Sequence, residues 1–122
     1  KGIVGAGGRG VFCGRIDVAK GAQQTNADQK SHALLLDTTA HVDSRPELAI
    51  RADDVVCRHG STVGDLDDEA VFYLRSRGVD EQTARELLMT SFCLEILDTI
   101  ADGVVRDALV DKVHLAQQGL RR

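Results

Sequence analysis

Cys57 and His59 are the residues whose types and spacing most directly suggest chemistry. Residues two apart on a β-strand point to the same face, with Cα atoms roughly 6.5–7 Å apart. In that geometry a thiolate and an imidazole can bind one metal ion such as iron or zinc. Two ligands do not complete a site, so a second strand or subunit would have to supply the others. Spacing alone leaves an alternative open, in which Cys57 is a small buried residue and His59 a hydrogen-bonded core histidine.

Other reactive side chains have simpler explanations. We expect the remaining histidines on the surface and the remaining cysteines as small apolar fillers: His32, His41, His114, Cys13 and Cys93. The acidic residues at positions 65–69 are explained by helix capping without a cation. Arg75 and Arg77 form a cationic pair that is either a solvated face or a docking surface.

Motifs of known catalytic chemistry are absent from the sequence. It contains no GxSxG, no HExxH and no P-loop. Residues 5–10 are rich in glycine but lack the Lys-Ser/Thr of a phosphate loop, so we interpret them as a turn. The three cysteines are widely spaced and form no CxxC pair, which argues against a zinc ribbon and against a disulfide-stapled secreted domain. A reducing, cytoplasmic compartment is the better expectation.

Composition narrows the class of partner. The chain has 122 residues, with 15 Lys and Arg against 19 Asp and Glu, and a net charge of −4. This mild acidity argues against nucleic acid as the main partner. Apolar runs such as residues 33–36 and 70–74 are far short of the ~20 residues that a membrane span needs. The sequence begins at Lys1 without a methionine, and we expect a fragment of a longer protein.

The first half of the chain, residues 1–64, has the period of β-strands. Phe12, Ile16 and Val18 alternate with Arg15 and Asp17, which predicts one strand with an apolar face. The same period predicts strands over residues 48–52 and 55–59, separated by polar turns that include residues 23–30 and 37–39. The pattern does not distinguish a sandwich, a barrel or a β-solenoid.

The second half, residues 65–122, has the period of helices. A first helix capped by Asp65 or Asp67 would end at Gly78, with Val79 folding back on its last turn. Asp80 would cap a second helix, which the Asp102–Gly103 pair would end. Its apolar residues recur every four positions and those of a third helix follow: Ala84, Leu88, Phe92, Ile96 and Ile100, then Val105, Ala108, Leu109, Val113 and Ala116. The third helix is expected to fray over residues 119–122.

Several strings in the sequence carry a family resemblance. Residues 52–55 (ADDV), 57–64 (CRHGSTVG) and 72–78 (FYLRSRG) closely resemble the SufD family of the SUF system for iron–sulfur cluster assembly. Four further strings match in the same order: residues 11–16 (VFCGRI, with Cys13 where asparagine is usual), 24–26, 34–36 and 42–48. Gly60 stands where the paralogous SufB family typically has glutamate, so the SufD family is favoured over SufB.

The resemblance implies a fold of mainly β plus α structure. Residues 1–64 would be the last turns of a right-handed parallel β-helix, and residues 65–122 a C-terminal region of three helices. It also implies a non-enzymatic scaffold subunit that pairs with a SufB-like subunit and docks a SufC-like ATPase through its helices. No nucleic acid or membrane partner is expected, and the isolated fragment would form a homodimer.

Particular residues take expected roles from the same resemblance. His59 matches a histidine implicated in assembling the nascent cluster at the subunit interface, and Cys57 matches a family cysteine. Arg75 and Arg77 lie in the helical region that would dock the ATPase. The iron–sulfur cluster would be transient and present only in the full complex, with no cofactor in the isolated fragment.

Two other interpretations remain beside the scaffold. One is a purely structural adaptor that recruits the ATPase while His59 only packs. The other is a stand-alone metalloenzyme, such as a solenoid acyltransferase or a cupin-like oxygenase. The sequence lacks the repeated hexapeptide of the first enzyme and the clustered histidines of the second.

Overall fold

The computed structural model describes residues 1–119, in which five strands precede three helices. The strands are β1 Gly2–Val4, β2 Arg9–Val18, β3 Asn26–Leu35, β4 His41–Ile50 and β5 Val56–Asp65, and the helices are α1 Asp68–Ser76, α2 Glu81–Leu97 and α3 Gly103–Gly119. Contacts divide the chain into two compact units. One contains Gly2 and Val4–Gly64, and the other contains the described residues from Asp65 to Gly119 together with Lys1 and Ile3. Among the described helices, none is long and apolar enough to cross a membrane.

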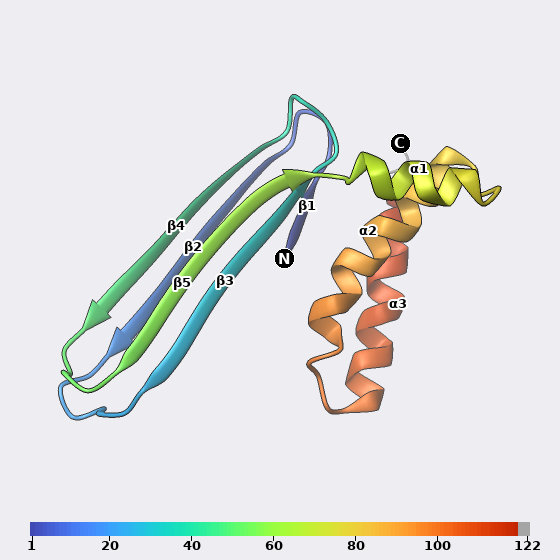
Figure 1. The fold of residues 1–122 in the computed structure, drawn as a ribbon. Helices are drawn as coiled ribbons and strands as arrows, with labels where there is room; N and C mark the ends of the chain where they lie inside the picture. The colour runs from blue at the N-terminus through green and yellow to red at the C-terminus, as the bar shows by residue number, and fades with distance from the viewer. Residues whose placement is uncertain (120–122) are drawn as a thin grey trace. The chain divides into compact units, whose positions relative to one another are not determined.

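Consecutive long strands lie in opposite sheets (Figure 1). One sheet has the order β1-β3-β5, and the other contains β2 and β4. β2 and β4 run parallel and pair Arg9 with His41 through Val18 with Ile50, a constant offset of 41 − 9 = 32 residues. Parallel neighbours need a crossover between them. Here the crossover from β2 to β4 is β3, a strand of the other sheet, rather than a helix.

Side chains along β2 confirm the predicted strand face. Ile16 is half-buried and Val18 is buried, whereas Arg15 and Asp17 between them are exposed. The apolar face of β2 therefore points between the two sheets, as the period of two requires.

β3 corrects the prediction of a polar turn over residues 23–30. Only the first residues of this segment form a turn. From Asn26 onward the chain is a ten-residue strand. Backbone pairing with the strands on either side outweighs the polar composition, because Asp28 and Lys30 face solvent while Gln29 between them is half-buried. The apolar end of the strand supplies two of the buried residues of this unit, Ala33 and Leu34.

Ion pairs on the outer face connect β2 to β4. Arg9 donates from Nε to Oδ2 of Asp43 at 3.1 Å, and Arg51, just beyond β4, donates from Nη2 to Oδ1 of Asp17 at 2.5 Å. The arginine hydrogen bonds lower the pKa of both carboxyl groups. All four side chains are substantially exposed, so each pair stabilises the fold only slightly.

The end of the β unit is open at β4 and β5. Each is the outer strand of its sheet in the described chain, so one edge of each has no strand neighbour. Leu48 and Ile50 of β4 lie beside Ile16 and Val18 and share their face, yet they are 37% and 42% exposed at this edge, where no further described strand pairs with β4. Of the two residues predicted to cap the first helix, Asp65 is the last residue of β5, and Asp67 is the cap.

Helix α1 has the predicted ends. Oδ1 of Asp67 accepts a hydrogen bond from the backbone N–H of Glu69 at 2.9 Å. At the other end Gly78 adopts φ +90°, and the N–H of Val79 donates to the carbonyl of Leu74 at 3.2 Å. This is the Schellman arrangement that glycine permits, and it confirms the predicted stop.

Helix α2 begins where the sequence predicts but ends earlier, and helix α3 follows it. Asp80 caps α2 by accepting from the N–H of Thr83 at 3.0 Å. α2 ends at Leu97, earlier than predicted, and Asp102 instead caps α3, accepting from the N–H of Val105 at 3.1 Å. A short side chain that accepts from the backbone favours a helix start over a helix end. Of the fraying predicted for residues 119–122, residues 120–122 lie outside the described chain.

The apolar faces of the two long helices are only partly as predicted. Ala84 is fully buried and Leu97 nearly so, but Ile96 is 48% exposed and Ile100 lies beyond the end of α2. Val105 of α3 is likewise 48% exposed. The two helices contact each other, and the hydroxyl of Thr90 donates a hydrogen bond across this contact to Oε1 of Gln117 at 2.9 Å.

Candidate functional site

Strand β5 carries the predicted pair, Cys57 and His59, on one face. Cys57 is half-buried and His59 is exposed, while Arg58 between them points to the opposite face and is also exposed. A fully buried core position, the alternative considered for His59, is therefore wrong. Its exposure follows from its place on the edge strand, where β3 flanks one side and the other side is open in the described chain.

The pair does not form a complete metal site by itself. Among the described residues, no group of three or more His, Cys, Asp or Glu side chains is placed to hold one ion. Cys57 and His59 can offer sulfur and nitrogen to iron, and further ligands would have to come from outside this part of the chain. The assignment of Cys57 and His59 as metal ligands stays a prediction.

Apolar side chains accompany the pair along the open end. Val63 lies on the same face of β5 and is 49% exposed, and Val56 on the opposite face is 52% exposed. Together with Leu48 and Ile50 of β4, these side chains make the uncovered end of the unit partly hydrophobic. Exposed apolar residues at an unpaired strand edge are typical of a surface that pairs with another chain.

Arg75 and Arg77 lie at the C-terminal end of α1 and already have partners within the helical unit. Arg75 Nη1 lies 3.3 Å from Oε2 of Glu81. The guanidinium of Arg77 stacks over the ring of Tyr73, 5.1 Å from its centroid. Tyr73 is 57% exposed and the neighbouring Phe72 is 72% exposed, so the arginines border an aromatic patch.

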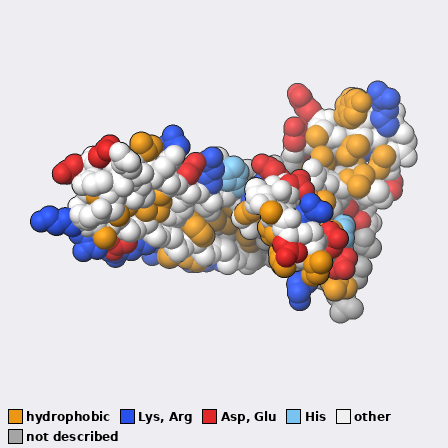
Figure 2. Space-filling model, turned by 90° about the horizontal axis from the view of Figure 1, so that it is seen from below, with side chains coloured by type: hydrophobic (Ala, Val, Ile, Leu, Met, Phe, Trp, Pro, Cys, Tyr) orange, Lys and Arg blue, Asp and Glu red, His pale blue; other side chains and the backbone are white. Residues whose placement is uncertain are grey.

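The sequence reasoning did not single out Phe72 and Tyr73 as surface residues. The signal was present in the helical period: Ala70, Val71 and Leu74 form the covered stripe of α1, and the two aromatic residues fall outside it. Hydrophobic side chains at the surface are visible in Figure 2.

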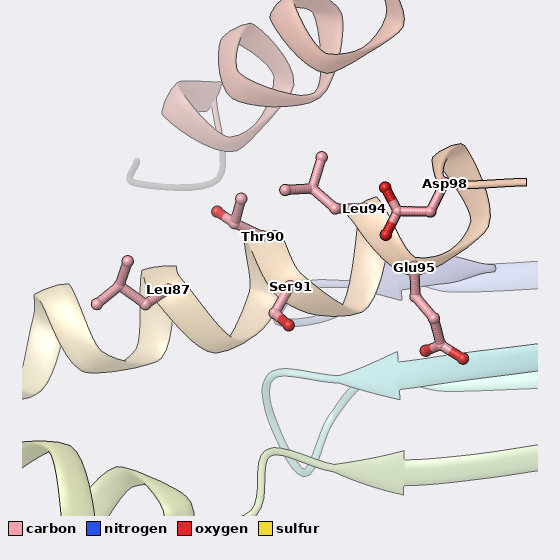
Figure 3. Close-up of a pocket in the computed structure, with 6 residues that line it drawn as sticks. All are labelled: Leu87, Thr90, Ser91, Leu94, Glu95 and Asp98. Carbon is pink, nitrogen blue, oxygen red and sulfur yellow. The ribbon is translucent and has the colours of Figure 1, made fainter. Parts of the chain in front are cut away.

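A second surface feature is a hollow along α2. Its lining comes from successive turns of that helix (Figure 3): Leu87, Thr90, Ser91, Leu94, Glu95 and Asp98. None of the described residues that line it is a cysteine or histidine, so Ser91 has no imidazole base among them, as a nucleophilic triad would need. The hollow offers leucine surface bordered by two carboxylates and no evident catalytic chemistry.

The remaining cysteines and histidines mostly lie where expected. His41 and His114 are exposed, as predicted, but His32 is half-buried on β3. Cys93 is half-buried in α2, where burial raises the pKa of its thiol. Cys13 is exposed, so its assignment as an apolar filler is wrong, because odd-numbered residues of β2 face outward.

Comparison with known proteins shows what this chain is similar to. A family model described as "SUF system FeS cluster assembly, SufBD core domain" matches residues 1–92. The match covers the whole β unit, including Cys57 and His59, and extends through α1 into α2.

Individual relatives agree with the family match. The chain is 41% identical over 113 residues to the iron–sulfur cluster assembly protein SufD of Escherichia coli, covering 93% of this chain and 27% of that protein. It is 41% identical over 105 residues to the chloroplastic protein ABCI7 of Arabidopsis thaliana, with coverage of 86% and 22%. It is 46% identical over 98 residues to a SufBD family protein of Synechocystis, with coverage of 80% and 22%. The chain thus spans about a quarter of the length of these relatives.

Proposed function

Because the chain belongs to the SufBD family of the SUF system, we propose that it serves as a non-enzymatic scaffold subunit in cytoplasmic iron–sulfur cluster assembly. Membership of the family supports participation in iron–sulfur cluster assembly. The surfaces described above support the role of a scaffold. In this proposal the growing cluster is a transient substrate held in the full complex. The isolated chain then needs no cofactor of its own.

We further infer that residues 1–64 are the last turns of a right-handed parallel β-helix. The constant offset of 32 residues between β2 and β4, with β3 of the other sheet between them, supports this interpretation. Each pair of strands then forms one turn of a solenoid, and each turn stacks on the one before. β4 and β5 form its final turn.

The observation that carries the scaffold role is the Cys57–His59 pair on the open edge of β5. A thiol and an imidazole that share a strand face suit iron, and their set of ligands is incomplete. We propose that a SufB-like subunit pairs along β4 and β5 and supplies the missing ligands. The cluster then assembles in the interface. Without that subunit, two copies of the isolated chain pair through the same edge and form a homodimer.

The helical unit has the second role in the proposal, that of docking a SufC-like ATPase. The exposed aromatic patch of Phe72 and Tyr73 with Arg75 and Arg77 is the surface that supports it. Aromatic and arginine side chains are enriched at the energetically important centres of protein interfaces. ATP hydrolysis belongs to the partner, which leaves this subunit without an active site.

A purely structural adaptor is the competing function, since Cys57 and His59 belong to no group of three or more metal-ligating side chains within the described chain. Complexes co-expressed with SufB-like and SufC-like subunits and purified anaerobically distinguish the two. The scaffold predicts that His59→Ala complexes keep all subunits but contain less iron and sulfide. His41→Ala, which changes another exposed strand histidine, is the matched control. Equal iron and sulfide in both variants would support the adaptor.

A further inference from the structure

Gln29 carries a buried side-chain nitrogen that has no hydrogen-bond partner. Its Nε2 is buried and makes no hydrogen bond within the described chain. A buried donor left unpaired costs about 1–3 kcal/mol, so a polar side chain in this position calls for an explanation.

The amide of Gln29 lies between the two sheets. It packs against Gly14 of β2 so closely that a Cβ at position 14 would come within 2.0 Å of Nε2. Gln29 is therefore an inward-facing residue of β3, and the missing side chain at Gly14 provides the room for it.

The strand register places Gln29 beside His59. β3 and β5 are hydrogen-bonded neighbours of ten residues each, and the N–H of Val56 donates to the carbonyl of Thr25 at 2.9 Å. Carried along both strands, this bond sets an offset of 56 − 26 = 30 residues, which aligns position 29 with position 59. Aligned residues on adjacent parallel strands share a face, roughly 5 Å apart, so Gln29 and His59 occupy neighbouring positions on one face of the sheet.

We propose that Gln29 is a positioning residue for His59, an inference that rests on the proposed role of His59 as an iron ligand. A histidine that binds a metal through one ring nitrogen usually donates the N–H of the other to a fixed acceptor, which sets its tautomer and orientation. The carboxamide of Gln29 offers an acceptor oxygen for that N–H. In this proposal a neighbouring strand of the β unit orients the imidazole before any partner subunit arrives.

Nitrogen-15 NMR of the His59 ring tests this without iron or partner, so its outcome is independent of cluster assembly. At a pH where the ring is neutral, wild type should strongly favour one tautomer, with a nuclear Overhauser contact between the Gln29 amide protons and the His59 ring. Gln29→Leu should change the tautomer ratio by at least about twofold. Ser44→Ala, which removes the other buried and unpartnered polar atom of the β unit, should leave it unchanged.

Gln29→Glu keeps the shape and the acceptor, and it provides a second variant should Gln29→Leu fail to fold. It should retain the wild-type tautomer. An unchanged tautomer ratio in folded Gln29→Leu, or the lack of any contact between the two side chains in wild type, would overturn the proposal. A preserved contact combined with normal cluster assembly by His59→Ala would instead contradict the iron-ligand role and leave the Gln29–His59 relationship standing.

Discussion

Gly14 and Gln29 face each other across the two sheets, with the carboxamide of Gln29 occupying the space that a side chain at position 14 would need. The ring of Phe12 borders the same space, with Cζ 2.9 Å from an ideal Cβ at Gly14. Neither neighbour can keep its place if a methyl group is added there.

Gly14→Ala should therefore lower the free energy of unfolding by about 1–3 kcal/mol, because the added methyl group forces the interior to repack. The measurement is urea denaturation followed by circular dichroism. Gly64→Ala, at a strand position where an added Cβ meets nothing within 4 Å, is the control and should be near neutral. Combining Gly14→Ala with Gln29→Ala should recover part of the lost free energy of unfolding. Strictly additive losses would show that the two residues do not contact each other.

The capping carboxyl of Asp80 should make the helical unit sensitive to acid. Its hydrogen bond with Thr83 lowers the pKa of Asp80 in the folded state. The stabilisation is therefore present above the unfolded pKa and is lost as pH falls through the lower folded value, in the region below about pH 4. Asp80→Asn keeps the cap and should weaken the pH dependence of the thermal midpoint between neutral and acid pH. An identical dependence in wild type and Asp80→Asn would contradict this assignment.

Charge reversal on α1 should weaken binding of a SufC-like ATPase. Arg75→Glu and Arg77→Glu place negative charge beside the exposed aromatic patch, and Arg77→Glu also removes the stacking on Tyr73. We expect each to raise the dissociation constant about tenfold or more, measured by calorimetry or pull-down. Arg106→Glu on α3 is the control for a change of net charge. Unchanged binding by both α1 variants would place the contact elsewhere.

The open end of the β unit should make the isolated chain self-associate. Val63 on the edge strand β5 is half exposed, and a lysine there would place charge on the paired surface. Light scattering should give a dimer for wild type and a shift toward monomer for Val63→Lys. Val11→Lys, at an exposed valine of β2, should keep the dimer. A clean wild-type monomer at high micromolar concentration would count against dimerisation through this edge.

The sequence predicted those elements whose local signals are strong. Alternation along β2 and the caps at Asp67 and Asp80 were readable because each depends on residues close in the chain. β3 was missed, since its polar first half becomes a strand only through backbone pairing with strands far away in sequence. The exposure of Ile96 was also missed, because periodicity shows that a helix has an apolar face but not how much of that face a neighbour covers.

The candidate site was predictable to the same degree. The spacing of Cys57 and His59 predicted a shared strand face, which the structure has. That β5 is an outer strand, and that Gln29 lies on the neighbouring strand at the level of His59, depends on sheet order and register. Neither can be read from one strand alone.

The account is tested most directly by the rate of cluster formation in anaerobic reconstitution with SufB-like and SufC-like subunits. His59→Ala removes a side chain that is exposed, so folding and subunit assembly should be nearly intact, as gel filtration should show. The absorbance that reports the iron–sulfur cluster should then rise at least about tenfold more slowly than with wild type or with His41→Ala, since a lost first ligand commonly costs that much or more. If the His59→Ala complex builds clusters at the wild-type rate, His59 is not a ligand and the chain acts as an adaptor.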